Sequence, residues 1–193
     1  DWEKAPSGNA VPAQIVFRAG EQSEKVLVSL FNPTAPSRAE LRGIYVENNG
    51  CVSIPAAGCH RVRENDRIKI TVVEDLGIEG PALQLGDPTA PLQIFRSRDV
   101  PCAEYDFYAF DAGSVDVYTY VLPTSSHVEY SQVWFESVMR NCAVNKSTLH
   151  IDKPGRHTLR IRVGDPGIVL QKIVLDFGGM KRSYLGPQST LIE

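Results

Sequence analysis

Short runs of β-branched and aromatic residues, separated by turns that contain glycine or proline, recur along the whole chain. Runs of this kind are typical of strands, and their close spacing indicates an all-β fold built as an antiparallel sandwich or a barrel. We expect strands over Gln14–Arg18, Lys25–Phe31, Gly43–Glu47, Val52–Ile54, Arg67–Val73, Ala82–Leu85, Tyr105–Phe110, Val115–Val121, His157–Val163 and Ile168–Asp176.

Two of these runs show which of their faces is turned to the core. In Val115–Val121, valine and threonine occupy the odd positions, whereas Asp116, Tyr118 and Tyr120 occupy the even ones. Successive side chains of a strand point to opposite faces, so the valines should be buried and the two tyrosines should share the other face. In Arg156–Val163, aliphatic residues alternate with threonine and arginine, which predicts a half-buried strand with a basic outer face.

Two segments depart from the strand pattern. Prolines at Pro33 and Pro36 cannot continue a ladder, so Pro33–Ser37 is a candidate hinge between a small N-terminal piece and the rest. In Tyr130–Val144, aromatic and aliphatic residues recur at a spacing that is compatible with either a helix or an irregular segment, and the sequence leaves both open.

Composition narrows the class of protein. The chain has 193 residues, a formal net charge of -3 and a pI of about 5.8. Because nucleic acids and anionic membranes attract a basic surface, we expect neither as a partner. No apolar run approaches the roughly 20 residues that a membrane helix needs.

The cysteines and histidines give no metal-binding pattern. Cys51, Cys59, Cys102 and Cys142 contain no C-x-x-C pair, and no two histidines have ligand spacing, so we expect no metal and no cofactor. Four cysteines allow two disulfides in three connectivities. The alternative, which we favour slightly, is that most of them are buried thiols.

Paired acids and exposed aromatics are the candidate chemistry. Glu104 and Asp106 share a strand face, but neighbouring carboxylates usually mark a solvated surface, and we expect no catalytic pair. Tyr118, Tyr120 and Trp134 are candidates for carbohydrate binding, since flat rings cover the apolar faces of sugars. The alternative is that these rings fill the core or a contact with another domain.

Several longer motifs resemble one known family. They are DKPGRHTL at 152–159, GDPGIVLQKIVLD at 164–176 and GGMKRSYLGP at 178–187, preceded by EYDFY at 104–108, AGSVDVY at 112–118, LPT at 122–124 and NGCVSI at 49–54. In this order they are similar to the C-terminal domain of glycoside hydrolase family 115, the xylan α-glucuronidases. The opening DWEKAPSG at 1–8 is similar to the immunoglobulin-like segment that precedes that domain.

The resemblance implies two parts: residues 1–43 as the trailing part of the immunoglobulin-like segment or a linker, and residues 44–193 as a β-sandwich of the jelly-roll, carbohydrate-binding-module type. It implies a secreted or periplasmic enzyme that removes glucuronic acid or its 4-O-methyl ether from xylan, with its catalytic domains N-terminal to this region. It further implies a homodimer in which this domain lies near the partner's active site. Arg140 is then a candidate to bind the uronate carboxylate, because a guanidinium matches a carboxylate in a bidentate manner.

The sequence departs from the family at two places. Family members often read I-E-A-E where this chain has IPAAG at 54–58, so we carry over no calcium site there. They also often have extra chain after the segment that matches LPT at 122–124, whereas here SSHV runs straight on.

Three functions follow from these observations. The first is a non-catalytic accessory domain with a structural or dimerisation role beside the active site. The second is an autonomous carbohydrate-binding module for glucuronoxylan, and the third, disfavoured by the lack of an acid/base pair, is an independent small enzyme. The direction in which the aromatic residues point separates the first two: an open groove favours binding, and a flat apolar patch favours packing.

Overall fold

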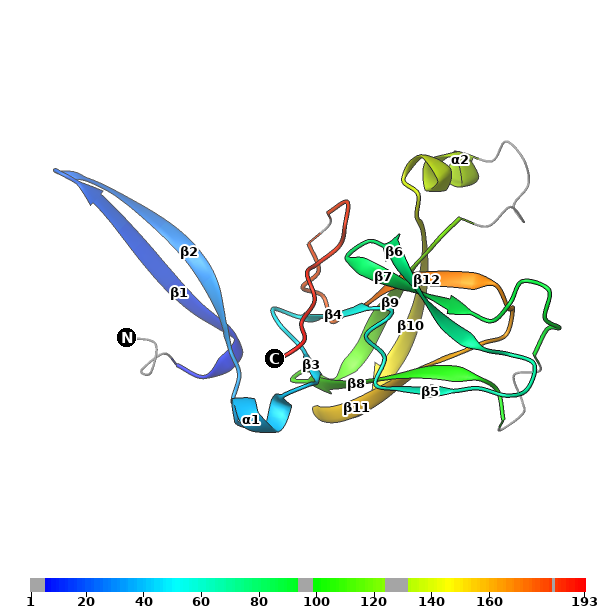
Figure 1. The fold of residues 1–193 in the computed structure, drawn as a ribbon. Coiled ribbons are helices and arrows are strands. Elements are labelled where there is room, and N and C mark those ends of the chain that lie inside the picture. The colour runs from blue at the N-terminus through cyan, green and yellow to red at the C-terminus, as the bar shows by residue number, and fades with distance from the viewer. Residues whose placement is uncertain (1–5, 94–98, 124–131, 182) are drawn as a thin grey trace.

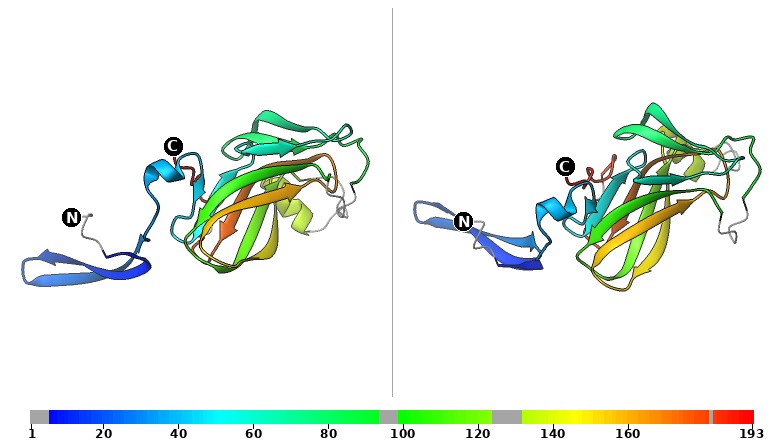
Figure 2. Two further views of the ribbon diagram at one scale, coloured as in Figure 1. Left: turned by 90° about the horizontal axis from the view of Figure 1, so that it is seen from below. Right: turned by 60° about the horizontal axis from the view of Figure 1, so that its bottom comes forward.

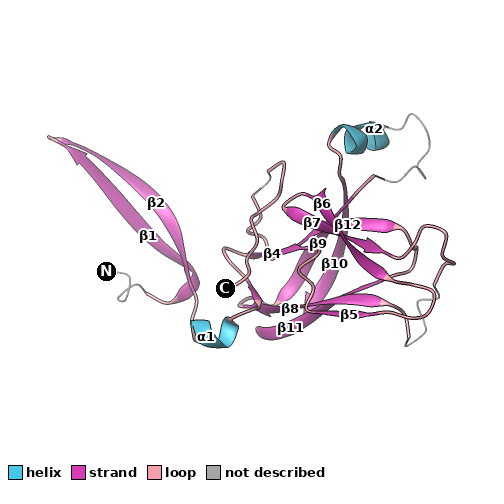
Figure 3. Cartoon of the chain, in the orientation of Figure 1, coloured by secondary structure: helices cyan, strands magenta, loops and turns pink. Residues whose placement is uncertain are grey.

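The structure is a computed structural model that describes residues 6–93, 99–123, 132–181 and 183–193. Two β-sheets form one body, and a long β-hairpin stands apart from it (Figures 1 and 3). The strands are β1 Gly8–Ala19, β2 Gln22–Asn32, β3 Tyr45–Val46, β4 Cys51–Pro55, β5 Arg61–Arg63, β6 Ile70–Gly77, β7 Gly80–Leu85, β8 Cys102–Ala109, β9 Gly113–Val121, β10 Ala143–Ile151, β11 Gly155–Arg162 and β12 Ile168–Asp176. The helices are α1 Arg38–Leu41 and α2 Gln132–Met139.

The larger sheet has the order β10-β9-β12-β7-β6, and all its pairs are antiparallel. One edge of β12 is shared, because β7 pairs with its first half and β4 with its second half. The smaller sheet is built on β8, which pairs with β11 on one side and with β5 and β3 on the other. Only the short β3 pairing is parallel. The two sheets face each other, as the views in Figure 2 show.

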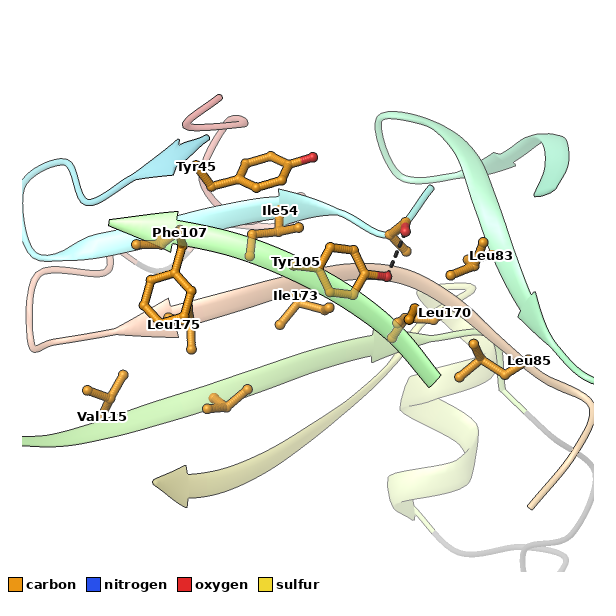
Figure 4. Packing of buried hydrophobic residues seen from close by; sticks show 14 of the residues in the cluster. Tyr45, Ile54, Leu83, Leu85, Tyr105, Phe107, Val115, Leu170, Ile173 and Leu175 are labelled. Atoms are coloured by element: carbon orange, nitrogen blue, oxygen red, sulfur yellow. Dashed lines mark hydrogen bonds between the residues drawn. The ribbon is translucent and has the colours of Figure 1, made fainter. Parts of the chain in front are cut away.

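The core lies between these sheets. Strand β8 contributes Tyr105 and Phe107, and the facing strand β12 contributes Leu170, Ile173 and Leu175 (Figure 4). These side chains are at most 3% exposed. Burial of this apolar area is the main source of stability, at about 25 cal/mol per Å².

The predicted faces of two strands are confirmed. Val115 and Val117 of β9 are buried in the core, whereas Tyr118 and Tyr120 lie on the outer face of the larger sheet. In β11, Leu159 and Ile161 pack against the core and the arginines point outward. Tyr105, another aromatic of the sequence, is wholly buried and donates a 2.7 Å hydrogen bond to the carbonyl of Ala56 (Figure 4).

The C-terminal segment crosses the outer face of the larger sheet after β12. The Lys172 ammonium, which is 0% exposed, donates to the carbonyls of Leu185 and Pro187 and pairs with Glu79 at 2.8 Å. The segment then runs beside β3, where Leu191 bridges Tyr45. A second apolar cluster is thereby formed on the outer face, around Tyr120 and Val174.

The β1–β2 hairpin extends away from the two sheets (Figures 1 and 2). Cross-strand partners share a face, so the register places one set of apolar side chains together. This apolar face of the hairpin consists of Val11, Ala13, Ile15, Phe17, Val26, Val28 and Leu30. Ile15, Phe17 and Val26 are 47%, 58% and 45% exposed, so the domain itself does not cover this face.

A short linker joins the hairpin to the sheets. Pro33 and Pro36 lie in it, and α1 follows with a capping box in which Ser37 and Glu40 satisfy each other's backbone N–H groups. Contacts between hairpin and sheets include the edge of Phe31 on Phe110 and hydrogen bonds from Asn9.

Several predicted elements differ in extent. The expected strand Arg67–Val73 corresponds to β6, which starts at Ile70 and runs to Gly77. β5 and β10 were not predicted. Of the segment left open between helix and irregular structure, 132–139 form α2 and 143–144 open β10, whereas 130–131 lie outside the described residues. All four cysteines are free thiols, which agrees with the favoured interpretation, but only Cys51 and Cys102 are buried, whereas Cys59 and Cys142 are half-buried.

Candidate functional site

A groove of about 910 Å³ lies on the outer face of the larger sheet. Alternation along β9 places Tyr118 and Tyr120 in its wall, and the register sets Tyr120 between Val144 of β10 and Lys172 of β12. Its lining comes from the end of β6 and the turn after it, from β9, from the turn after α2, from β10 and β12, and from the C-terminal segment. The lining residues are Asp75, Leu76, Gly77, Ile78, Tyr118, Tyr120, Arg140, Asn141, Cys142, Val144, Gln171, Met180, Lys181, Ser183, Tyr184, Leu185 and Gly186.

The turn after α2 brings Arg140 to the groove. Asn141 has a positive φ of 51°, and the amide of Cys142 donates back to Ser137, so the chain leaves the helix in the left-handed conformation that often ends helices. The hydroxyl of Tyr184 donates to the carbonyl of Arg140 at 3.0 Å. The C-terminal segment is thereby linked to this turn, and together they enclose one side of the groove.

Gln171 lies at the base of the groove and was not singled out by the sequence. Its amide nitrogen donates to the carbonyl of Leu76 at 3.1 Å, whereas its Oε1 is buried and has no partner among the described residues. The β9–β12 register shifts between Leu170 and Lys172, which turns the intervening glutamine outward. A buried polar atom left unpaired costs about 1–3 kcal/mol.

The described lining residues of the groove include two basic side chains and one carboxylate. Arg140 and Lys181 are its basic side chains, and among the described lining residues Asp75 alone carries a carboxylate. A glycosidase that uses the common mechanism needs two facing carboxyl groups. Burial raises the pKa of Tyr120 and of Cys142, so both groups stay neutral near pH 7.

The structure brings three of the four predicted binding residues together. Tyr118, Tyr120 and Arg140 line the groove, and Lys146 lies 5.8 Å from the ring centre of Tyr118. Trp134 lies on α2 and is not among the described lining residues. The sequence offered no signal for Lys181 or Tyr184, because an irregular segment carries them.

The expectation that Glu104 and Asp106 form a solvated surface was wrong for Glu104, whereas the Asp106 side chain remains 28% exposed. Glu104 is 6% exposed and accepts from Arg61 at 2.8 Å and from Arg160 at 2.7 Å. Asp106 accepts two bonds of 2.6 Å from Arg61 and one of 2.7 Å from Thr158. Arg61 lowers the pKa of both acids, that of Asp106 to about 2, so neither can serve as a general acid near neutral pH.

The described residues contain neither a metal cluster nor a membrane-spanning helix. No three histidine, cysteine, aspartate or glutamate side chains gather there as a metal cluster. No described helix is long and apolar enough to cross a membrane.

The fold and the groove define the class: a two-sheet β domain with an aromatic groove on its outer face. No curated protein sequence matches the chain. The profile of the Glycosyl hydrolase family 115 C-terminal domain matches residues 44–132 and 124–189. The chain therefore belongs to glycoside hydrolase family 115, as its C-terminal domain. The two matched segments overlap at residues 124–132, next to the place where we expect family members to have extra chain.

A solved structure of the same family agrees with this assignment at the level of the fold. BtGH115A, described as a novel family GH115 4-O-methyl-α-glucuronidase with specificity for decorated arabinogalactans, is similar over 77% of this chain, with 20% identity and a TM-score of 0.51. This chain spans 19% of the length of that structure, which places neighbouring domains beside a domain of this kind. The isomalto-dextranase of Arthrobacter globiformis T6 in complex with panose is more remote, with 13% identity over 79% of this chain and 27% of that one and a TM-score of 0.44.

Proposed function

We propose that this chain is the non-catalytic C-terminal accessory domain of a xylan α-glucuronidase, with a structural and dimerisation role beside the active site. Family membership supports a hydrolase as the parent protein. The apolar face of the hairpin is the observation on which the role depends, because an exposed apolar stripe on a long two-stranded ribbon needs a partner.

The occupant of that face in this proposal is the polypeptide N-terminal to the hairpin. The hairpin is then the trailing part of an immunoglobulin-like segment, residues 1–43, and the remaining 44–193 form a jelly-roll sandwich. The hairpin has one apolar face and one mixed face. This is the pattern of a sheet whose apolar face packs against a second sheet, and in this proposal the N-terminal polypeptide supplies that second sheet. Xylan is an extracellular polymer, so we further propose a secreted or periplasmic location.

The test uses two variants of the full-length parent enzyme, each with one added charge on one face of the hairpin. Ile15→Asp places a carboxylate on the apolar face. Leu27→Asp, at a position that is 83% exposed on the opposite face, is the matched control. We expect Ile15→Asp to increase cleavage in limited proteolysis near residues 33–37 and to weaken the dimer in sedimentation, whereas Leu27→Asp leaves both unchanged. Equal behaviour of the two variants would contradict the proposal.

A second function is favoured by the groove. An autonomous carbohydrate-binding module for glucuronoxylan would place a sugar ring on Tyr118 and a uronate carboxylate on Arg140.

Calorimetric titration with aldouronic oligosaccharides separates this function from the accessory role. Saturable binding that weakens tenfold or more in Arg140→Gln, and not in Arg42→Gln away from the groove, would establish a binding module. The absence of binding heat at millimolar sugar would contradict the binding module and leave the accessory role as the remaining proposal.

A further inference from the structure

The joint between the hairpin and the sheets contains an arrangement of oxygen atoms that the sequence did not suggest. Glu47 follows β3, and Phe110 and Asp111 form the turn between β8 and β9. Asn9 of β1 reaches this turn, where its amide nitrogen donates to the Phe110 carbonyl at 3.4 Å and to the Asp111 carboxylate. Three segments that are far apart in the chain therefore meet at one point.

Glu47 is held rigidly and is almost inaccessible, with 1% of its surface exposed. Its Oε2 accepts from the backbone amides of Phe110 at 2.7 Å and of Asp111 at 2.9 Å. Its Oε1 is buried and has no partner among the described residues. The two amide bonds fix the carboxylate through Oε2 and leave Oε1 as a buried acceptor without a partner among the described residues.

The charge at this point is not balanced by a cation of the chain. The Asp111 carboxyl lies within hydrogen-bonding reach of Glu47. No described lysine, arginine or histidine forms an ion pair with either acid, whereas Glu104 and Asp106 are both neutralised by arginine. Two carboxylates in contact, one of them buried, repel each other unless a positive species lies between them.

Two neutral oxygens complete the set. The carbonyl of Phe110 already faces Asn9, and a half-turn of the Asn9 amide would replace its nitrogen by Oδ1 at the same place. Glu47 and Asp111 then supply carboxylate oxygens. Asn9 and Asp111 are half-buried, so water can fill the remaining positions. All of these ligands are hard oxygen donors at irregular positions on three segments, which suits Ca²⁺ better than the smaller and geometrically strict Mg²⁺ or the thiol- and imidazole-binding Zn²⁺.

We propose that Glu47, Asp111, the Phe110 carbonyl and the Asn9 amide form a binding site for one calcium-like divalent cation. The cation ties the hairpin to the sheets, since Asn9 belongs to the hairpin and the other three ligands belong to the larger body. This site is distinct from the I-E-A-E position, where the family's two acids are replaced by Pro55 and Ala57.

The experiment is a calorimetric titration of the chain, after treatment with a chelator and its removal, with CaCl₂ and in parallel with MgCl₂. We expect one Ca²⁺ per chain and binding weakened at least tenfold by Asp111→Asn. Asp165→Asn is the control, because Asp165 is exposed and follows the end of β11 that pairs with Cys102, at the opposite end of β8 from Phe110. Hydrogen exchange provides a second readout: saturating Ca²⁺ should slow exchange in residues 8–11 and 30–32 at the base of the hairpin, and Asn9→Ala should remove this effect.

Three outcomes would overturn the proposal. One is the absence of Ca²⁺ binding to the folded chain, and another is Ca²⁺ binding that Asp111→Asn and Asn9→Ala leave unchanged. The third is a free energy of unfolding that changes with pH to the same extent in the presence of Ca²⁺ and of a chelator. This result would show that the carboxyl groups of Glu47 and Asp111 share a proton and bind no cation. Asn9→Ala removes a half-buried side chain outside the core, so it keeps the test valid even if Asp111→Asn fails to fold.

Discussion

Replacing Lys172 with methionine tests how the C-terminal segment is held on the larger sheet. The Lys172 ammonium is wholly buried and makes three polar contacts: 2.8 Å to Glu79, 2.9 Å to the Leu185 carbonyl and 2.7 Å to the Pro187 carbonyl. Methionine keeps most of the volume and the apolar stem but removes all three contacts.

The structure sets the expected magnitude. A hydrogen bond to a charged group contributes about 1.5–3 kcal/mol, and removing one partner of a buried ion pair costs about 3–5 kcal/mol. Glu79 is 25% exposed and can be partly rehydrated, and the methionine packs in place of the lysine stem. These gains offset part of the three lost contacts, so we expect Lys172→Met to lower the free energy of unfolding by about 3–5 kcal/mol.

The assay is urea denaturation followed by far-UV circular dichroism. The midpoint of unfolding is compared between the variant and the unchanged protein, provided that both show the same dependence of unfolding free energy on urea. Lys69→Met is the matched control, because Lys69 forms a 3.3 Å pair with Glu64 in which the side chains are 65% and 34% exposed. Surface pairs of this kind contribute about 0–1 kcal/mol. Hydrogen exchange of the Thr190 and Ile192 amides, which pair with Ser53 and Ile44, should accelerate in Lys172→Met only.

A loss of less than about 1 kcal/mol in Lys172→Met, or a loss equal to that of Lys69→Met, would refute this reasoning. Such a result would mean that the apolar contacts around Tyr120 and Val174 hold the segment without the ammonium. Unchanged exchange at Thr190 in a destabilised variant would likewise show that Lys172 supports the sheet rather than the segment.

Three further predictions concern the core and the ion pairs. Ile173→Ala removes a side chain that is 0% exposed between the sheets and should cost about 2–5 kcal/mol in urea denaturation. Tyr105→Phe leaves the buried Ala56 carbonyl unpaired and should cost about 1–3 kcal/mol by the same measurement. The pKa of Asp106 is lowered to about 2 by Arg61, so its contribution to stability is complete above pH 4, near the ordinary value, and is lost as the pH falls toward 2. Asp106→Asn should therefore reduce the fall in melting temperature between pH 4 and pH 2. An unchanged fall would contradict the stabilising role of the ionised Asp106 carboxylate.

The sequence predicted the strands that alternate strongly and missed those that do not. Strands β9 and β11 were placed with their correct faces, because valine and leucine recur at every second position. β10, with the sequence AVNKSTLHI, was missed since most of its side chains are exposed at the edge of the larger sheet and its polar residues hide the alternation. A three-residue strand such as β5 is too short to give any periodic signal.

The groove was predictable only in its aromatic wall. Tyr118 and Tyr120 share a face by simple alternation, and Arg140 was named from the family resemblance. Gln171 could not be identified, because it faces outward only where the register of β12 shifts, and a register shift depends on the partner strand rather than on the local sequence. Lys181 and Tyr184 reach the groove because the C-terminal segment is fastened to the sheet by Lys172.

The sequence by itself determined the class of fold and, through its motifs, the family, since both are expressed in the order and period of residues along the chain. The tertiary structure alone decided the partners of the charged groups. Glu104 and Asp106 are joined to arginine across strands 43 and 45 residues away, and Glu47 is brought to Asp111 and Asn9 from distant segments. The physical reason is that the electrostatic role of a carboxylate depends on its burial and on its neighbours in space, and neither property is encoded in the local pattern.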